Sequence, residues 1–444
     1  MEASRKSIWG WALYDWANSV FATTVIAGFF PIFFKQFWSA GADVSVSTAQ
    51  LGFANSLSSL LIALTAPILG AIADRGRLKK PLLAVFTYLG VFMSAGLYFI
   101  EQGQWEWAVL VYVLGSLGFA GGNIFYDAML ADLVPDDQLD RISSFGYALG
   151  YLGGGLLFLI NVLMTLQPDW FGLAGPAEAV RLSFLTVAVW WGIFSVFTLL
   201  WVPEVSQGTP TKGSSILAGF QQLAETFRKI RHLRTLFLFL AAYWFYIDGV
   251  GTVIRMAVDY GLSIGFSSSD LITALLLVQF IGFPAALFFG RLGTRWDCRK
   301  SILVGIGIYL IVTIWGTQMK SQFEFYGLAV LIGIAQGGVQ ALSRSFYARL
   351  IPKNQTAEYF GFYNTLGKFA AIIGPLLMGM TALMAKGWLL GDSPSAAELE
   401  SVGQEAARWS IASISILFLI GGALLWKVDE EQGRREARIL ERHD

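Results

Sequence analysis

The chain has 444 residues, of which 55% are hydrophobic and only 14% are charged, against about 25% charged residues in an ordinary soluble domain. This composition excludes a soluble globular protein as the leading interpretation. The 31 Lys and Arg balance the 31 Asp and Glu, so no global basic field exists to attract nucleic acid. One cysteine, Cys298, and two histidines, His232 and His443, are too few for a disulfide framework or a Cys/His zinc site. We therefore expect no metal and no cofactor.

Long apolar runs separated by short polar segments predict an all-α membrane protein with twelve transmembrane helices. A span needs about 20 apolar residues, and continuously apolar runs favour helices over a barrel, whose strands alternate. The predicted helices are Trp9 to Phe34, Gln50 to Ala73, Pro81 to Ile100, Trp107 to Leu130, Ile142 to Leu166, Leu182 to Val202, Leu236 to Ala257, Leu271 to Phe289, Ser301 to Met319, Phe325 to Ser343, Tyr359 to Met384 and Trp409 to Trp426.

The distribution of Lys and Arg predicts the orientation in the membrane. Segments on the side of the N-terminus hold 24 of these residues and segments on the other side hold 6, and the excess marks the cytoplasmic side. We therefore expect both termini in the cytoplasm. Short outer loops and the lack of a targeting segment favour a bacterial inner membrane. Tryptophans such as Trp9, Trp11 and Trp426 fall at predicted helix ends, where an interfacial aromatic belt is expected.

One long inner connection divides the predicted helices six and six. Within it, apolar residues recur at helical spacing and basic residues gather at the C-terminal end, which predicts an amphipathic helix lying on the inner membrane surface. A regulatory partner site would give the same pattern. The predicted organisation is a first six-helix bundle, the linker, a second six-helix bundle and a cytoplasmic tail, at residues 1–202, 203–234, 235–428 and 429–444.

The two halves repeat each other in sequence. The segment Gly70 to Lys80 aligns with Gly290 to Lys300. Further along, Leu133-Val-Pro135 aligns with Leu350-Ile-Pro352, and we call the alignment that places Leu133 on Leu350 the repeat register. A parallel repeat of six helices with matched inner loops is typical of a transporter whose halves rock about a central site.

The loop Gly70-Ala-Ile-Ala-Asp74-Arg75-Gly-Arg-Leu-Lys79-Lys80 resembles the signature of the major facilitator superfamily. Three further strings resemble the bacterial branch related to the autophagy-linked vacuolar amino-acid effluxers: Tyr14-Asp15-Trp16-Ala17-Asn18-Ser19, Gly338-Val-Gln340-Ala-Leu-Ser-Arg344-Ser345, and Phe360-Gly-Phe-Tyr-Asn364 with Gly367-Lys368. The resemblance implies two six-helix pseudo-repeat bundles and export of small solutes such as amino acids, although one fold hosts many cargoes.

The same resemblance implies a gate at the inner ends of the two halves, with Asp74 also facing a helix N-terminus. In the second copy of the loop Thr294 stands where Asp74 stands in the first, so we expect the second gate to be less tightly latched. The residues assigned to the gate from the two loops are Gly70, Asp74, Arg75, Lys79, Lys80, Gly290, Arg295 and Arg299.

Ionisable residues inside the predicted spans are functional candidates, because a charge near the bilayer centre costs about 2.5 to 3.5 kcal/mol even on a lenient scale. Asp15 and Asn18 share one small, polar face of the first helix, and Asp248 and Arg255 share one face of the seventh. Burial favours the neutral form of a carboxyl group, which a proton-coupling group needs. We expect Asp248, with Asp15 second, to bind a proton or a substrate ammonium group. The alternative is that each caps a buried hydroxyl or backbone group.

A further pair follows from the repeat. In the repeat register Asn123 corresponds to Gln340. Asp127 corresponds to Arg344 in the same register, so equivalent inner helix ends carry opposite charges. A salt bridge between Asp127 and Arg344 would shut the inner mouth of the central site and break on opening. A separate partner on a neighbouring helix is equally allowed for each residue.

Lys368 lies four residues after Asn364 in the eleventh predicted helix. Its ammonium group could meet a substrate carboxylate or neutralise Asp15. The alternative is that its long stem reaches the inner interface, as lysines near helix ends do.

The sequence thus predicts a secondary transporter, expected as a monomer in the lipid bilayer, that moves a small solute by alternating access with protons as the coupling ion. Amino acids are one candidate cargo. An exporter of another metabolite, sugar or drug, or a uniporter, would look the same. A receptor or embedded enzyme is disfavoured because no nucleophile and base pair, metal cluster or ligand domain is recognisable, and the ATP-binding loop of a primary pump is missing.

Overall fold

The computed structural model describes residues 4–41, 44–76, 78–204, 228, 233–263, 267–370, 373–389 and 396–443. The first half begins with a continuous helical rod, α1, η1, α2 and η2, in which the η segments have π-helical turns. Its elements are α1 Arg5–Val20, η1 Phe21–Phe29, α2 Phe30–Phe33, η2 Phe34–Trp38, α3 Val44–Gly76, α4 Lys79–Phe99, α5 Trp105–Leu133, α6 Leu139–Leu166, the short η3 Pro168–Phe171, and α7 Pro176–Trp201.

The second half repeats this series of long helices and ends in an additional one. Its elements are α9 Arg234–Ser263, α10 Ser268–Arg295, α11 Cys298–Gln318, α12 Gln322–Leu350, the short η4 Lys353–Gln355, α13 Thr356–Phe369, α14 Ile373–Leu389, α15 Ala396–Trp426 and α16 Glu430–His443. The predicted amphipathic linker helix falls almost entirely outside the described residues.

Polar residues between the spans begin several helices by satisfying the free backbone N–H groups of the first turn. Ser267 and Asp270 form a reciprocal capping box at the start of α10. Ser321 and Glu324 form another at the start of α12. The side chain of Asp297 accepts the N–H of Lys300 at the start of α11. The short loops therefore set where each span begins.

Eleven helices of the described residues are long and apolar enough to cross a membrane. The remaining predicted helix, Tyr359 to Met384, is the eleventh along the chain and is present as two shorter helices, α13 and α14. Pro375 explains the break, because proline lacks the N–H for a helical hydrogen bond and its ring clashes with the carbonyl of the residue four positions earlier. It is tolerated as the third residue of α14. The predicted all-α membrane fold is thus confirmed, with one of the spans interrupted.

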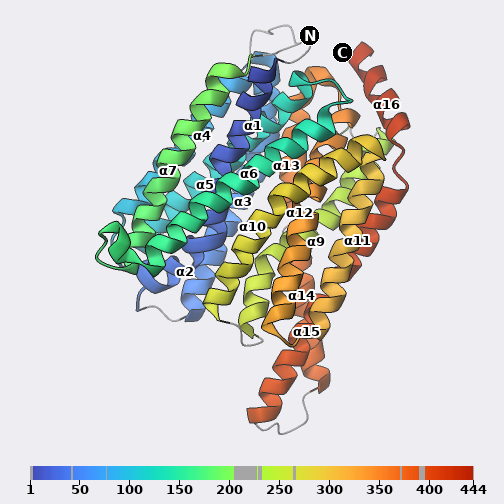
Figure 1. The fold of residues 1–444 in the computed structure, drawn as a ribbon. Coiled ribbons are helices and arrows are strands. Elements are labelled where there is room, and N and C mark those ends of the chain that lie inside the picture. Colours follow the sequence, from blue (N-terminus) through green and yellow to red (C-terminus); the bar gives the residue numbers. More distant parts are fainter. Residues whose placement is uncertain are drawn as a thin grey trace.

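The two bundles meet along two helix pairs that the internal repeat makes equivalent. In the centre of the molecule α6 of the first half packs along α10 of the second, and α3 packs along α13 (Figure 1). Both chain termini lie at the same end of the bundle (Figure 1). We call this end the termini face and the other end the opposite face.

Several helices extend further than the sequence predicts. The helix α12 continues to Leu350, so Arg344 lies inside it rather than directly after its end, and α10 likewise continues to Arg295. The helix α15 begins at Ala396, well before the predicted Trp409. The predicted tail after the last span contains a regular helix, α16. Hydropathy ends a helix at the first charged residues after an apolar run, whereas here those residues continue the helices.

Candidate functional site

A polar cluster lies where α1 and α5 of the first half meet α12 of the second. Asp15 and Asn18 project from α1 and are buried. Asn18 donates a hydrogen bond from its amide nitrogen to Asn123 Oδ1 on α5 at 2.6 Å. Tyr126, also on α5, donates its hydroxyl hydrogen to Asp15 Oδ2 at 2.7 Å. The polar side chains on the predicted face of the first helix thus find hydrogen-bond partners on α5.

Arg344 of α12 joins this cluster from the other half. Its Nη1 atom lies 3.0 Å from Asp127 Oδ1, and its Nη2 atom lies 3.5 Å from Asp15 Oδ2. Its Nε donates to the Ser143 hydroxyl and its Nη2 to the Ser143 carbonyl, both at 2.9 Å. Only 2% of the Arg344 side chain is exposed. The ion pair that the repeat predicts between Asp127 and Arg344 is present, and Arg344 also reaches Asp15.

Three aromatic rings enclose the guanidinium group of Arg344. Its central carbon lies 4.4 Å from the ring centre of Tyr147, 4.9 Å from that of Trp11 and 5.2 Å from that of Tyr126. The faces of such rings attract a cation. Trp11 is fully buried here and stacks on Tyr126. Trp11 therefore packs against neighbouring helices and does not present its ring to lipid.

Among the side chains that the structure describes, the charges of this cluster do not balance. Asp15 and Asp127 carry two formal negative charges when ionised, and Arg344 carries one positive charge. Asn364 of α13 donates to Asp127 Oδ2 at 3.4 Å, so both oxygens of Asp127 accept N–H donors. Among the described residues no donor contacts Asp15 Oδ1. A buried charge without a partner is costly, so Asp15 Oδ1 is the atom at which one further positive charge would be stabilised.

Asp248 lies elsewhere, at the break in the eleventh span. Its Oδ2 accepts the N–H of Gly374 at 2.9 Å and its Oδ1 accepts the hydroxyl of Thr252 at 3.3 Å. Gly374 is the second residue of α14, so Asp248 satisfies a free N–H at a helix start and complements the helix dipole. These contacts match the capping alternative for Asp248. The side chains of Arg255 and Lys368 lie outside the described residues.

Gln340 is the remaining residue of the predicted central set. It lies one turn before Arg344 on α12 and is partly buried. Among the described residues its side chain has no hydrogen-bond partner. Its amide is therefore free to bind another group near the cluster.

At the termini face, Asp74 of α3 reaches across to the second half. Its carboxylate accepts the N–H groups of Ala357 and Glu358, at 3.2 and 2.9 Å, in the first turn of α13. Lys79 places its Nζ 2.9 Å from Asp74 and 2.7 Å from Asp132 of α5. We call these contacts the first gate contact.

Close backbone approach accompanies the first gate contact. A Cβ atom on Gly70 would overlap the carbonyl oxygen of Ala357. The Nζ atom of Lys79 also donates to the Thr356 hydroxyl at 2.7 Å, again in α13. The first half therefore holds the start of α13 through one helix cap, one lysine and one glycine.

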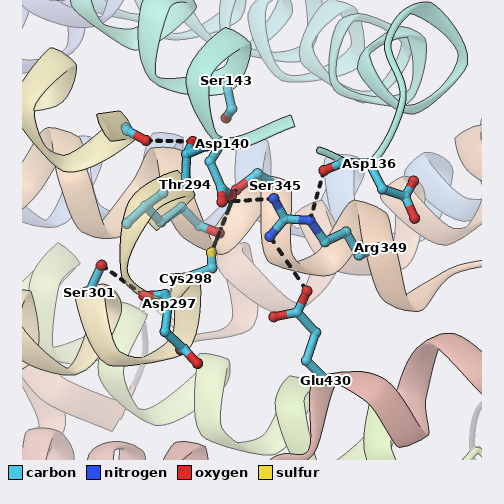
Figure 2. Close-up of polar contacts among 12 residues, drawn as sticks. Asp136, Asp140, Ser143, Thr294, Asp297, Cys298, Ser301, Ser345, Arg349 and Glu430 are labelled. Carbon is cyan, nitrogen blue, oxygen red and sulfur yellow. Dashed lines mark hydrogen bonds and ion pairs between the residues drawn. The ribbon is translucent and has the colours of Figure 1, made fainter. Parts of the chain in front are cut away.

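The equivalent contact between α10 and α6 uses different residues. A Cβ atom on Gly290 would overlap Ser144 of α6, so the close approach repeats. Asp140 of α6 binds Arg349 of α12 at 2.7 Å and accepts a hydrogen bond from Ser345 (Figure 2). Arg349 Nε also donates to the Asp136 carbonyl at 3.1 Å. We call these contacts the second gate contact.

Three residues assigned to the gate do not join the two halves. Lys80 donates to the carbonyl of Val202 in its own half. Arg299 donates to the carbonyls of Trp426 and Val428 in its own half. Arg295 is exposed at the end of α10. The repeat places these basic residues at equivalent positions along the chain but does not fix which way they point. The side chain of Arg75 lies outside the described residues.

Comparison with known proteins agrees with this architecture. The sequence profile of the family described as "Vacuole effluxer Atg22 like" matches residues 3–51 and 41–383. The uncharacterized MFS-type transporter YxiO of Bacillus subtilis (strain 168) is 39% identical over 426 residues, which cover 95% of this chain and 94% of that protein. The chain belongs to the Atg22-like family.

The MFS-type relative YxiO places the Atg22-like chain among the major facilitator transporters, and further matches agree with it in sequence or in fold. Autophagy-related protein 22 of Yarrowia lipolytica is 24% identical over 87% of this chain and 76% of that protein. The proton:xylose symporter XylE matches with a TM-score of 0.70 at 15% identity, over 98% of this chain and 97% of that chain. The human organic anion transporter MFSD10 matches with a TM-score of 0.69 at 15% identity, over 95% and 99%. The Atg22-like chain is a transporter of small solutes, not an enzyme.

Sequence reasoning missed several residues of the Atg22-like chain that complete these sites. Tyr126, Ser143 and Tyr147 surround Arg344, and Asp140 and Arg349 form the second gate contact. The repeat offers one usable signal, because Asp132 corresponds to Arg349 in the repeat register. The aromatic residues carry no such signal, since tyrosine and tryptophan are common throughout the spans.

Proposed function

We propose that this protein is a proton-coupled exporter of amino acids in a bacterial inner membrane, with the termini face in the cytoplasm. The observation that carries the proposal is the contact of Arg344, from the second half, with the carboxylates of Asp15 and Asp127, from the first half. Because the contact crosses the interface between the halves, it is made when the termini face closes and is lost when that face opens.

The unbalanced charge supplies a reason for coupling. With both carboxylates ionised, the described side chains of the cluster carry one excess negative charge in a buried setting, which a proton or a ligand ammonium group can neutralise. Asp15 Oδ1 is the atom without a donor among the described residues. A proton or cation bound there weakens the attraction between Asp15 and Arg344, so binding is linked to the separation of the halves.

An amino acid suits the chemistry of this cluster. Its ammonium group complements Asp15, and its carboxylate competes with Asp127 for the guanidinium of Arg344. The amides of Asn18, Asn123 and Gln340 offer further hydrogen-bonding groups near the cluster. The description of the matching family, "Vacuole effluxer Atg22 like", supports efflux. The excess of Lys and Arg on the termini side supports a cytoplasmic termini face.

The test is uptake of a mixed pool of labelled amino acids into proteoliposomes, with and without an imposed pH gradient. The wild type is expected to accumulate at least one amino acid only when the gradient is present. Asp15→Asn is expected to lose this accumulation and to keep exchange of labelled for unlabelled substrate, because exchange needs no net proton movement.

Asp248→Asn is the matched control, since it neutralises another buried aspartate of the equivalent helix. Asparagine can still accept the N–H of Gly374, so gradient-driven accumulation is expected to persist. Loss of the gradient response in Asp248→Asn but not in Asp15→Asn would move the coupling site to Asp248. A wild type that moves no amino acid under any gradient would refute the cargo.

A further inference from the structure

The helix after the last span, α16, is packed against the second half. Gly433 faces Leu350 and Thr235 so closely that a Cβ atom would overlap Leu350. Glu436 accepts both the N–H and the hydroxyl of Thr235 at 3.2 Å. Ala437 is buried. The helix therefore has a fixed place at the termini face, beside α9 and α12.

Two charged side chains of α16 extend to the second gate contact. Glu430 lies 3.7 Å from Arg349 Nη1, whereas Asp140 binds the other terminal nitrogen, Nη2 (Figure 2). Arg434 binds Glu430 one turn away and places its Nη1 3.9 Å from Asp136 Oδ2. Asp136 belongs to the connection between α5 and α6, so Arg434 reaches from the tail to the first half.

The far end of α16 supports the same acidic residue indirectly. Glu441 accepts the N–H of Lys353 at 2.7 Å, which fixes the turn after α12. The ammonium group of Lys353 lies 3.1 Å from Asp136 Oδ1. Both carboxylate oxygens of Asp136 therefore face cations that α16 supplies or positions.

The charges across the interface explain the direction of the effect. Arg349, Lys353 and Arg434 belong to the second half and face two acids of the first half, Asp136 and Asp140. Glu430 lies among these cations and offsets their mutual repulsion. When the halves separate, every pair with Asp136 or Asp140 is broken, whereas the contacts of α16 with its own half remain.

We propose that α16 is a strap that stabilises the closed termini face by holding Arg434 and Lys353 on Asp136 of the opposite half. The strap adds to the buried pair of Asp140 and Arg349. It makes the tail a determinant of how often the transporter opens to this side, independently of the cargo.

The single cysteine of the chain provides the readout. Cys298 is 3% exposed and lies against Ser345, which donates to Asp140 of the first half (Figure 2). Separation of the halves removes Asp140 and uncovers Cys298. The rate at which a maleimide alkylates Cys298 in the full-length, membrane-reconstituted protein therefore measures the opening of the termini face, and no substrate is needed.

Arg434→Gln is the test variant and Arg435→Gln is its matched control. The two arginines are adjacent on α16, and each pairs with a glutamate one turn earlier, but Arg435 is 78% exposed and its recorded ion pair is with Glu431 of α16. Loss of a partly exposed pair of about 1 kcal/mol corresponds to about fivefold faster alkylation for Arg434→Gln. Arg435→Gln is expected to match the wild type.

Two further variants separate a strap from a simple packing role. In an Asp136→Asn background, Arg434→Gln is expected to add nothing, because both changes remove the same pair. High salt should shrink the difference between Arg434→Gln and the wild type. Equal alkylation rates for Arg434→Gln and Arg435→Gln overturn the proposal, as does a full effect of Arg434→Gln in the Asp136→Asn background.

Asp140→Asn removes the neighbouring buried ion pair of Asp140 with Arg349, and its alkylation rate is the reference for losing that pair. If it accelerates alkylation while Arg434→Gln does not, the termini face is held by Asp140 and the strap is refuted. If Asp140→Asn fails to accelerate alkylation, this cluster does not hold the face closed and the proposal fails as well. Size-exclusion profiles and unfolding temperatures equal to those of the wild type exclude misfolding as the cause of a faster rate.

Discussion

The internal repeat makes the two gate contacts equivalent, and yet different kinds of interaction join the halves in each. In the first, Asp74 caps the start of α13 and Lys79 neutralises it. In the second, Thr294 stands at the corresponding position and, within the described part of the chain, bonds only the carbonyl of Gly290 in its own helix. The two halves are joined there by Asp140 and Arg349, an ion pair that itself crosses the interface.

Equivalent positions in the two halves carry different charged groups. In the repeat register Asp132, the partner of Lys79, corresponds to Arg349. Ala357, whose N–H is capped by Asp74, corresponds to Asp140. The repeat thus preserves where the halves touch, including the close approach at Gly70 and Gly290, while the charged groups at these points differ.

The largest expected effect comes from removing the central cation of the first gate contact. Lys79→Met leaves Asp74 and Asp132 as buried acids without their partner, which costs about 3 to 5 kcal/mol. We expect a large drop in unfolding temperature in detergent and loss of transport. Lys80→Met is the control, because the hydrogen bonds of Lys80 in the described structure are with Glu204 and Val202 of its own half, and it should stay near the wild type. Equal losses in the two variants would show that the basic loop acts as a whole.

A bulky residue at Gly70 tests whether the close approach is needed. Gly70→Val places side-chain atoms against the backbone of α13 and should disfavour the closed state by up to about 3 kcal/mol, near 100-fold in its population. Faster alkylation of Cys298 is the measurement. Gly307→Val is the control, because a Cβ atom there meets nothing within 4 Å. An unchanged rate in Gly70→Val would mean that the first gate contact does not control opening.

The third comparison changes Asp74 and its counterpart Thr294 in parallel. Asp74→Ala removes a charged acceptor of two backbone N–H groups, worth about 2 kcal/mol. Thr294→Ala removes only a bond within its own helix and should stay within about 0.5 kcal/mol. The measurement is the alkylation rate of Cys298 in each variant. A large effect of Thr294→Ala would contradict the assignment of the second closure to Asp140 and Arg349.

The smallest expected effect concerns the joint between α15 and α16. Arg299→Gln loses the donors to the Trp426 and Val428 carbonyls, which costs about 1 kcal/mol or less. If the joint positions α16, alkylation of Cys298 should rise by a few-fold at most, and the rise should vanish in an Arg434→Gln background. A full additional rise in that background would indicate that Arg299 acts separately from the strap.

Hydropathy and the repeat predict most of the fold, because spans, halves and equivalent loops are properties of position along the chain. The ion pair of Asp127 and Arg344 follows from the same register. The break in the eleventh span has a signal in Pro375, which hydropathy alone does not weigh. The contacts of Lys80 and Arg299, and the aromatic enclosure of Arg344, depend on how each helix is rotated about its axis. Apolar residues on every face of a span conceal that rotation.

The excess charge of the central cluster has an electrical consequence. Moving one elementary charge through the whole membrane potential changes the free energy by about 2.3 kcal/mol per 100 mV. When Asp15, Asp127 and Arg344 carry a net negative charge, the cluster cannot move along the membrane field without electrical work. If opening displaces it along the field, the equilibrium between the closed and the open state depends on the membrane voltage. Neutralising the charge removes that dependence. The opening of the loaded carrier and that of the empty carrier should then depend differently on the membrane potential. The size of that potential would therefore determine which step of the transport cycle is slowest.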